Sequence, residues 1–394
     1  MQRALAFFVL TSVVALCCAC GAYAQPAAAT VAPAVPQPPI EARAPSIEAK
    51  AWLLLDLRSR QVIASHAVDE RVEPASLTKL MSAYLVFDAV KQKQIALDQR
   101  LPVSQKAWKM AGSRMFLSPA ATPTVEELLR GLIVVSGNDA TITLAEGVAS
   151  SEDEFVARMN QQARRLGLSG TRFANATGLP DPQHYSTTAD LARLAEAVSR
   201  DFPMYLPLYA LRSLTYNGIT QPNRNVLLGR DPRVDGLKTG HTENAGYCLI
   251  ATAHSGDRQL LAVIVGAASE NARALEAQKL LNYGFQYYQT VRLYGQGDTV
   301  AELPVWKGSA RRLRAGFEAD LYVSVPRGQV ELLQATLTSL QPLLAPVSQQ
   351  QRVGVLHLAF DGKPMGEYPV VALESVSVAN LFLRIWDGLR LLFN

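Results

Sequence analysis

The sequence predicts an α+β protein that carries a second, smaller all-β domain. Within residues 48–288, runs of strand length stand near both ends, and a series of segments with helical spacing lies between them. Sheet segments that flank inserted helices are typical of an α+β domain. After Tyr288 the pattern changes to short β-like runs separated by turns, which predicts a small β sandwich over residues 289–375.

Two hairpins are predicted to supply the sheet of the first domain. Residues 49–70 contain two apolar runs around a polar break. Residues 245–254 and 258–268 form a second pair of runs, and the turn sequence "SGD" separates them. Helices are predicted wherever apolar residues recur at three- and four-residue spacing, and several begin at Ser or Thr caps. These segments are residues 76–93, 124–136, 138–149, 151–167, 187–200 and 276–291.

The size and charge of the chain limit the classes of function that it could have. It has 394 residues, of which 49% are hydrophobic, so it can bury a large core. The formal net charge of +4 is spread along the sequence without a long basic block. The cluster "RRLR" at residues 311–314 is interpreted as a solvated turn. A nucleic-acid partner is therefore not expected.

The N-terminus has the pattern of an export signal. Arg3 supplies positive charge and residues 4–20 are apolar. Small residues precede Gln25, as at a cleavage site, so residues 1–24 are predicted to be a signal peptide. Residues 25–47 are dominated by Pro and Ala, which predicts a tether. The mature chain is expected to be exported.

The cysteines bear on disulfide formation. Three of the four, Cys17, Cys18 and Cys20, lie in the predicted signal, so no disulfide is expected within the mature chain. The apolar setting of the remaining Cys248 favours a buried small side chain. A competing interpretation is a lipid-modified Cys20, although the residues before it make a poor lipidation site.

The all-β domain is predicted from four runs of strand-like sequence. It holds no cluster of nucleophile, base and acid, which favours a spacer or a partner-binding unit. The runs are residues 299–306, 320–328, 330–340 and 351–373.

The last segment, residues 376–394, is amphipathic. Its charges recur too often for a spanning helix, whereas Trp386 and two arginines suit a helix that lies in a membrane interface. The alternative is a final helix packed on the all-β domain. The predicted apolar face comprises Val378, Leu381, Phe382, Ile385, Leu389, Leu392 and Phe393.

Ser76 and Lys79 form the first candidate for catalysis. Pro74 makes a helix start plausible, and residues three apart are neighbours on one helix face. The positive field of a helix N-terminus favours negative charge on the serine, and a partly desolvated lysine can take its proton. The pair alone is also compatible with a helix cap followed by a solvated lysine.

Two further clusters strengthen this interpretation. Ser136 and Asn138 follow an apolar helix, where a hydroxyl could relay a proton and an amide could hold a substrate carbonyl. Lys238, Thr239 and Gly240 stand just ahead of a predicted strand, where a cation, a carboxylate-binding hydroxyl and a residue that lets substrate backbone approach are useful together. Each cluster alone is also compatible with a turn.

The three clusters in this order resemble the signature of penicillin-binding proteins and serine β-lactamases. More closely, the chain is similar to low-molecular-mass penicillin-binding proteins that act as serine D-alanyl-D-alanine carboxypeptidases. The similarity runs through "EPASLTKLMSAYLVFDAV", "LLRGLIVVSGNDA" and "VDGLKTGHTENAGYCL" and extends over nearly the whole mature chain. Gly137 replaces the aspartate of the β-lactamase signature, as it does in these carboxypeptidases.

The resemblance implies a role for each of these residues in hydrolysis of a peptidoglycan stem pentapeptide. Ser76 would attack the penultimate D-alanine, with Lys79 as its base. Ser136 and Lys238 would pass the proton to the leaving amine, and Asn138 would hold the peptide. Backbone N–H groups of Ser76 and His241 would form the oxyanion hole.

The terminal carboxylate would be bound by Thr239 and an arginine, for which Arg224 and Arg273 are the candidates. Both arginines are equally compatible with surface caps. His241 is compatible with a strand-edge histidine, and His184 is expected to be structural. No metal or organic cofactor is implied. The resemblance also implies β-lactam binding and a peripheral position on the periplasmic side of the inner membrane.

Several rival functions remain open at this point. A serine β-lactamase needs a base for deacylation, and the residues between Gly178 and Asp190 include no glutamate. A penicillin-binding wall sensor that has lost turnover is a second rival, and an esterase of the same architecture is a third. Transpeptidation shares the acyl-enzyme and differs only in its acceptor.

Overall fold

The computed structural model describes residues 44–391. The predicted signal peptide, most of the predicted tether and the last three residues of the C-terminal segment lie outside these residues.

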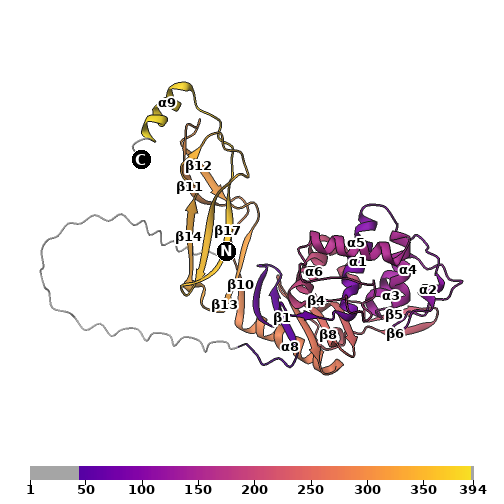
Figure 1. The fold of residues 1–394 in the computed structure, drawn as a ribbon. Coiled ribbons are helices and arrows are strands. Elements are labelled where there is room, and N and C mark those ends of the chain that lie inside the picture. The colour runs from indigo at the N-terminus through magenta and orange to yellow at the C-terminus, as the bar shows by residue number, and fades with distance from the viewer. Residues whose placement is uncertain (1–43, 392–394) are drawn as a thin grey trace, which may run out of the picture. The chain divides into compact units, whose positions relative to one another are not determined.

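An antiparallel five-stranded sheet forms the centre of the first domain (Figure 1). Its strand order is β2-β1-β9-β8-β7, so both predicted hairpins are confirmed and lie side by side. The strands are β1 (Ala51–Asp56), β2 (Gln61–His66), β7 (Val234–Thr242), β8 (Gly246–Ser255) and β9 (Arg258–Ala267). β1 is buried along its whole length, because it is an interior strand with a packed layer on each face.

The two faces of the sheet pack on different cores. Leu54 belongs to a cluster with α8, whereas its neighbours Leu53 and Leu55 join the larger cluster of the inserted helices. Successive side chains of a strand point to opposite faces, which explains this division. The helices are α1 (Lys79–Lys91), α2 (Gln105–Trp108), α3 (Val125–Val134), α4 (Asn138–Ala149), α5 (Glu152–Arg165), α6 (Thr188–Asp201), α7 (Leu227–Arg230) and α8 (Glu270–Tyr287).

Short elements complete this domain. They are β3 (Arg71–Val72), β4 (Ser186–Thr187), β5 (Ser213–Tyr216), β6 (Ile219–Pro222) and the 3₁₀ helices η1 (Ala75–Thr78) and η2 (Pro203–Leu208). η1 corrects one expectation, because Ser76 lies in this 3₁₀ turn and α1 itself begins only at Lys79.

The cluster Lys238–Gly240 lies inside a strand and not ahead of one. β7 pairs with β8 over its whole length, with Lys238 opposite Ile250 and Gly240 opposite Cys248. The glycines and the lysine interrupt the apolar pattern of this strand in the sequence, but the sheet buries them all the same.

The closing helix of the first domain also differs from its prediction. α8 begins six residues earlier than expected, because the Ser269 side chain accepts a hydrogen bond from Ala272 N and caps it. It ends at Tyr287, after which the β-branched and aromatic residues continue as strand β10 (Tyr288–Tyr294).

The all-β domain contains a six-stranded sheet of order β14-β16-β17-β12-β11-β15 and the β10–β13 pair, which share one apolar core. The cluster "RRLR" is not a turn: it falls largely in β12, where Leu313 and Ala315 point into this core and Arg312 and Arg314 are exposed. The remaining elements are β11 (Thr299–Trp306), β12 (Arg312–Gly316), β13 (Leu321–Pro326), η3 (Val330–Leu332), β14 (Leu333–Ser339), β15 (Leu343–Leu344), β16 (Arg352–Phe360) and β17 (Lys363–Ala372).

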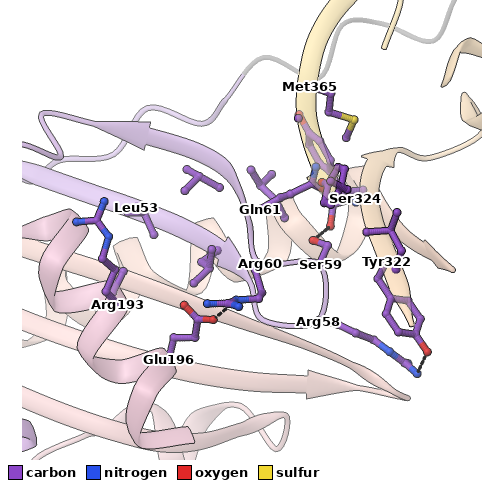
Figure 2. A pocket seen from close by; sticks show the side chains of 18 of the residues that line it. Leu53, Arg58, Ser59, Arg60, Gln61, Arg193, Glu196, Tyr322, Ser324 and Met365 are labelled. Atoms are coloured by element: carbon purple, nitrogen blue, oxygen red, sulfur yellow. Dashed lines mark hydrogen bonds and ion pairs between the residues drawn. The ribbon is translucent and has the colours of Figure 1, made fainter. Parts of the chain in front are cut away.

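The turn between β1 and β2 contacts β13 of the all-β domain (Figure 2). Arg58 donates a hydrogen bond to Tyr322 Oη over 2.8 Å, and the hydroxyls of Ser59 and Ser324 lie 2.7 Å apart. In the same turn, Arg60 forms an ion pair with Glu196 of α6. The groove beside these contacts is lined by none of the residues of the cleft described below.

The C-terminal segment contains helix α9 (Leu381–Arg390), and none of its residues is buried. Its polar face meets the all-β domain, where Asp387 accepts a hydrogen bond from Lys307 N over 2.7 Å. The apolar face points away from that contact, since Phe382 is 87% exposed and Trp386 is 58% exposed. Among residues 44–391, no helix combines the length and the apolar character needed to cross a bilayer.

Candidate active site

A cleft of about 460 Å³ gathers the three predicted clusters. Among the segments that line it are η1, the α3–α4 turn, the loop at residues 177–179, β7 and the first turn of α8. Predicted site residues that line it directly are Ser76, Ser136, Asn138, Arg224, Thr239, Gly240, His241 and Arg273. Lys79 and Lys238 lie beneath its surface.

Ser76 and Lys79 are in hydrogen-bond contact. Lys79 Nζ lies 3.0 Å from Ser76 Oγ. Side chains three residues apart are eclipsed in a 3₁₀ helix, so the η1 turn brings the hydroxyl and the amine closer in direction than an α-helix would. The two side chains therefore lie together as expected, but a 3₁₀ turn brings them together and not an α-helix.

Lys79 is completely buried, and three oxygens surround its amine. Besides Ser76, Nζ contacts Asn138 Oδ1 and the Thr177 carbonyl, each at 2.7 Å. Burial lowers the pKa of Lys79 to about 7, against the opposing charge of Asp139.

The surroundings of this amine suit a base. A neutral amine has two hydrogens and one lone pair. Asn138 Oδ1 and the Thr177 carbonyl can only accept, so they take the two hydrogens. The lone pair is then left for the Ser76 O–H.

Ser136 occupies a strained position in the cleft. Its backbone φ is 58°, in the left-handed region, and its buried Oγ makes no hydrogen bond to any of the residues 44–391. Strain and an unpartnered buried hydroxyl are features of functional sites. Asn138 begins α4 and donates from Nδ2 to the Ala111 carbonyl over 2.6 Å.

Asp139 is a residue of the site that the sequence analysis missed. Its buried carboxylate accepts hydrogen bonds from the backbone N–H groups of Met115 and Leu117, both over 3.0 Å. It thereby fixes the loop that meets the α3–α4 turn at the cleft. The available signal was a carboxylate in the first turn of a helix, directly after the Ser-Gly-Asn motif.

Lys238 is also completely buried and donates to the Thr239 carbonyl over 2.8 Å. Burial lowers its pKa well below the usual value, and the positive charges of Lys79, Arg273 and Arg224 add to this effect. A lysine in these surroundings gives up its proton easily.

Gly240 relieves crowding on the protein side of the cleft. A Cβ on this residue would lie 3.2 Å from both Pro74 O and Ser76 N. The glycine therefore lets β7 pack against η1, the turn that carries Ser76. Gly240 also lines the cleft, so a close approach of substrate backbone to this residue stays a prediction.

The two candidate arginines differ in their contacts. Arg273 is 5% exposed and donates to the carbonyls of Gly240 and Arg224 and to the Glu270 carboxylate. The guanidinium of Arg224 is exposed and has no hydrogen bond or ion pair to any described residue. Arg224 is thus free to meet a ligand, whereas Arg273 holds two segments of the cleft together.

Family models match both domains. A model of the family described as D-alanyl-D-alanine carboxypeptidase matches residues 39–269, more than half of the chain. The chain belongs to the D-alanyl-D-alanine carboxypeptidase family. A second model, described as the C-terminal domain of penicillin-binding protein 5, matches residues 288–378 of this carboxypeptidase. The predicted family resemblance and the α+β fold with a following β domain are confirmed.

Individual relatives agree with the family assignment. This carboxypeptidase is 38% identical to D-alanyl-D-alanine carboxypeptidase DacC of Escherichia coli, over 89% of this chain and 90% of that protein. Penicillin-binding protein 5 of Haemophilus influenzae superposes with a TM-score of 0.81 at 34% identity, over 84% of this chain and 98% of that structure. Penicillin-binding protein D2 of Listeria monocytogenes, solved with ampicillin bound, gives a TM-score of 0.57 at 30% identity, over 61% and 98%.

Proposed function

We propose that this carboxypeptidase removes the terminal D-alanine from peptidoglycan pentapeptides through an acyl-enzyme on Ser76. The observation that carries the proposal is the contact of 3.0 Å between Ser76 Oγ and Lys79 Nζ, whose pKa burial lowers to about 7. Near neutral pH a large share of Lys79 is neutral and can take the serine proton.

Acylation then proceeds in two steps. As Lys79 accepts the proton, Ser76 Oγ bonds to the carbonyl carbon of the penultimate D-alanine. The negative charge on the carbonyl oxygen is stabilised by the backbone N–H groups of Ser76 and His241, residues that line the same cleft. The C–N bond breaks as the proton that Lys79 took from Ser76 passes through Ser136 and Lys238 to the departing amine, which leaves Lys79 neutral again. Water then hydrolyses the ester and restores the free serine.

The substrate is held from both sides of the cleft. Asn138 retains one amide hydrogen beyond its bond to Ala111 O, and this hydrogen can donate to the peptide. Thr239 and the free guanidinium of Arg224 bind the terminal carboxylate. Arg273 supports them by holding the Gly240 and Arg224 carbonyls.

Penicillin would acylate Ser76 in the same way, as the ampicillin complex of the Listeria relative suggests. The cleft offers little for fast hydrolysis of that adduct. Among its lining residues the only carboxylate belongs to Glu270, and Arg273 holds it in an ion pair. This favours a penicillin-trapped carboxypeptidase over a β-lactamase.

The same proposal includes the location and organisation of the chain. The exposed apolar face of α9 suits the interface of a membrane, so we place the enzyme on the periplasmic side of the inner membrane. The proposed division is a signal peptide (1–24), a tether (25–47), a catalytic domain (48–288), an all-β domain (289–375) and an anchoring helix (376–394).

Purified protein without the signal tests this function. It should release D-alanine from a diacyl-L-Lys-D-Ala-D-Ala peptide and become labelled by fluorescent penicillin, and Ser76→Ala should lose both properties while it stays folded. Labelling without D-alanine release would identify a wall sensor instead. Rapid penicillin turnover without a trapped adduct would identify a β-lactamase.

A further inference from the structure

A buried histidine connects the nucleophile turn to the loop on the other side of Lys79. His184 is 3% exposed, and its Nε2 lies 2.7 Å from Thr78 Oγ1, in η1. Its Nδ1 accepts a hydrogen bond from Ala174 N over 3.1 Å. Because Nδ1 is an acceptor, the proton is on Nε2, and the ring donates to Thr78.

The segment that begins at Ala174 touches the proposed base directly. The Thr177 carbonyl accepts from Lys79 Nζ, and the Ala176 carbonyl accepts from Ser82 Oγ of α1 over 2.6 Å. Asn175 Oδ1 folds the segment by accepting from three successive backbone N–H groups, those of Thr177, Gly178 and Leu179. The Thr177 carbonyl is therefore a fixed acceptor, provided that the segment keeps its place against η1.

We propose that His184 is a positioning residue for the general base: by bonding Thr78 and Ala174 together, it holds the Thr177 carbonyl against the Lys79 amine. The inference rests on the proposed role of Lys79. Thr78 directly precedes Lys79 in the chain, so the ring fixes the loop to the residue next to the base.

The hydrogen bonds of His184 stay unchanged over the pH range in which Lys79 titrates, because the histidine is not protonated there. Burial lowers the pKa of His184 to about 4, with Asp181 and Glu73 opposing and Lys79 adding to the effect. The ring therefore stays neutral near pH 7, in the tautomer that both hydrogen bonds require. The charged groups around Lys79 itself are Asp139 and Lys238.

Removal of the ring would open the dry surroundings of the lysine. Thr78 Oγ1 and Ala174 N would lose their partner, and the space beside the Phe173 ring, whose centroid lies 5.8 Å from that of His184, would admit water. Better hydration of the charged amine would raise the pKa of Lys79 toward 10.5, its ordinary value. In a plot of acylation rate against pH, the rise of the rate would then move to higher pH.

The experiment measures the second-order rate of penicillin acylation from pH 5.5 to 9.5 for the full mature chain and for His184→Ala, together with kcat and KM for D-alanine release. We expect the variant to acylate about 3- to 10-fold more slowly at pH 7, to approach the wild-type rate above pH 9, and to lose kcat with little change in KM. The reason is that a higher pKa leaves a smaller neutral fraction of Lys79 at pH 7. A profile that superimposes on the wild type would overturn the proposal.

Three further variants make the result specific. His184→Asn keeps an acceptor for Ala174 and His184→Gln keeps a donor for Thr78, so each should shift the profile less than alanine does, and both serve if His184→Ala fails to fold. Phe173→Leu is the matched control, since it loosens the same core without touching either hydrogen bond. It should lower the melting temperature and leave the profile in place. An equal shift in Phe173→Leu would show that His184 acts only as a core residue and would overturn its positioning role. A wild-type protein that is not acylated by penicillin would instead refute the proposed function.

Discussion

Lys79 shows how burial can lower the pKa of an ordinary side chain. The amine has no exposed surface, and two of its three oxygen neighbours can only accept hydrogen bonds. Desolvation disfavours the charged form, so the pKa falls to about 7. The Asp139 carboxylate limits this fall.

The pH dependence of acylation should follow this lysine. Below pH 7 the neutral fraction falls tenfold per pH unit, so the acylation rate should fall with the same slope and reach a plateau above pH 7 to 8. Lys79→Arg should lose about 10²- to 10⁴-fold, because a guanidinium is not deprotonated in proteins. Stopped-flow labelling with penicillin measures both. A rate independent of pH between 5.5 and 8 would contradict the role of Lys79.

Substitution of the two arginines should affect different properties, namely substrate binding for Arg224 and stability for Arg273. Arg224→Ala should raise KM about 10- to 100-fold for a substrate with a free terminal carboxylate and leave the melting temperature unchanged, because its guanidinium has no partner in the described residues. Arg273→Ala should lower the melting temperature, since it leaves two backbone carbonyls without their donor. Steady-state kinetics and thermal melts test this, and an unchanged KM in Arg224→Ala would assign carboxylate binding elsewhere.

Among the secondary-structure elements, close backbone approaches around η1 shape the cleft. β7 meets η1 at Gly240, and the loop of residues 174–179 meets it at Gly178. A Cβ on Gly178 would lie 1.8 Å from Ala75 O, and its φ is +84°. No other residue type fits there without moving the turn that carries Ser76.

Gly178→Ala should therefore disable the site through its backbone. The left-handed conformation alone costs about 1–2 kcal/mol, and the clash with Ala75 adds to it. We expect a lower melting temperature and at least a tenfold loss of penicillin labelling. Gly229→Ala in α7 is the control, because a Cβ there meets nothing within 4 Å. Normal labelling of Gly178→Ala would show that the turn tolerates displacement.

The sequence revealed the side chains of the site better than its backbone groups. Ser76, Lys79 and Ser136 are recognisable because their chemistry belongs to the residue type. Thr177 acts through its carbonyl, which any residue supplies, so no sequence signal pointed to it. Strand β7 was missed for a related reason, since tertiary burial overrides the weak strand pattern of Lys238 to Gly240. β12 did carry a signal, as arginines alternate with Leu313 and Ala315.

For the whole molecule, the order of the domains was predictable because composition changes sharply after Tyr288. The contacts that the β1–β2 turn makes with β13 were not, because they join residues such as Ser59 and Ser324 that lie far apart in the chain. α9 was predicted as an amphipathic helix, and its polar face is the one that meets the all-β domain. Its apolar face is exposed.

Membrane binding should depend on that apolar face. Phe382→Asp combined with Trp386→Asp should abolish co-sedimentation with vesicles that contain anionic lipid, and D-alanine release from a soluble peptide should remain unchanged. Val330→Asp, at an exposed apolar residue of the all-β domain, is the matched control and should bind normally. Equal binding of the double variant would show that α9 does not anchor the chain.

Mass spectrometry of the protein after treatment with benzylpenicillin tests the central claim most directly. Proteolysis of the treated protein should place one penicilloyl adduct on Ser76, and Ser76→Ala should carry none. An adduct on another residue, or D-alanine release by Ser76→Ala at the wild-type rate, would contradict the account.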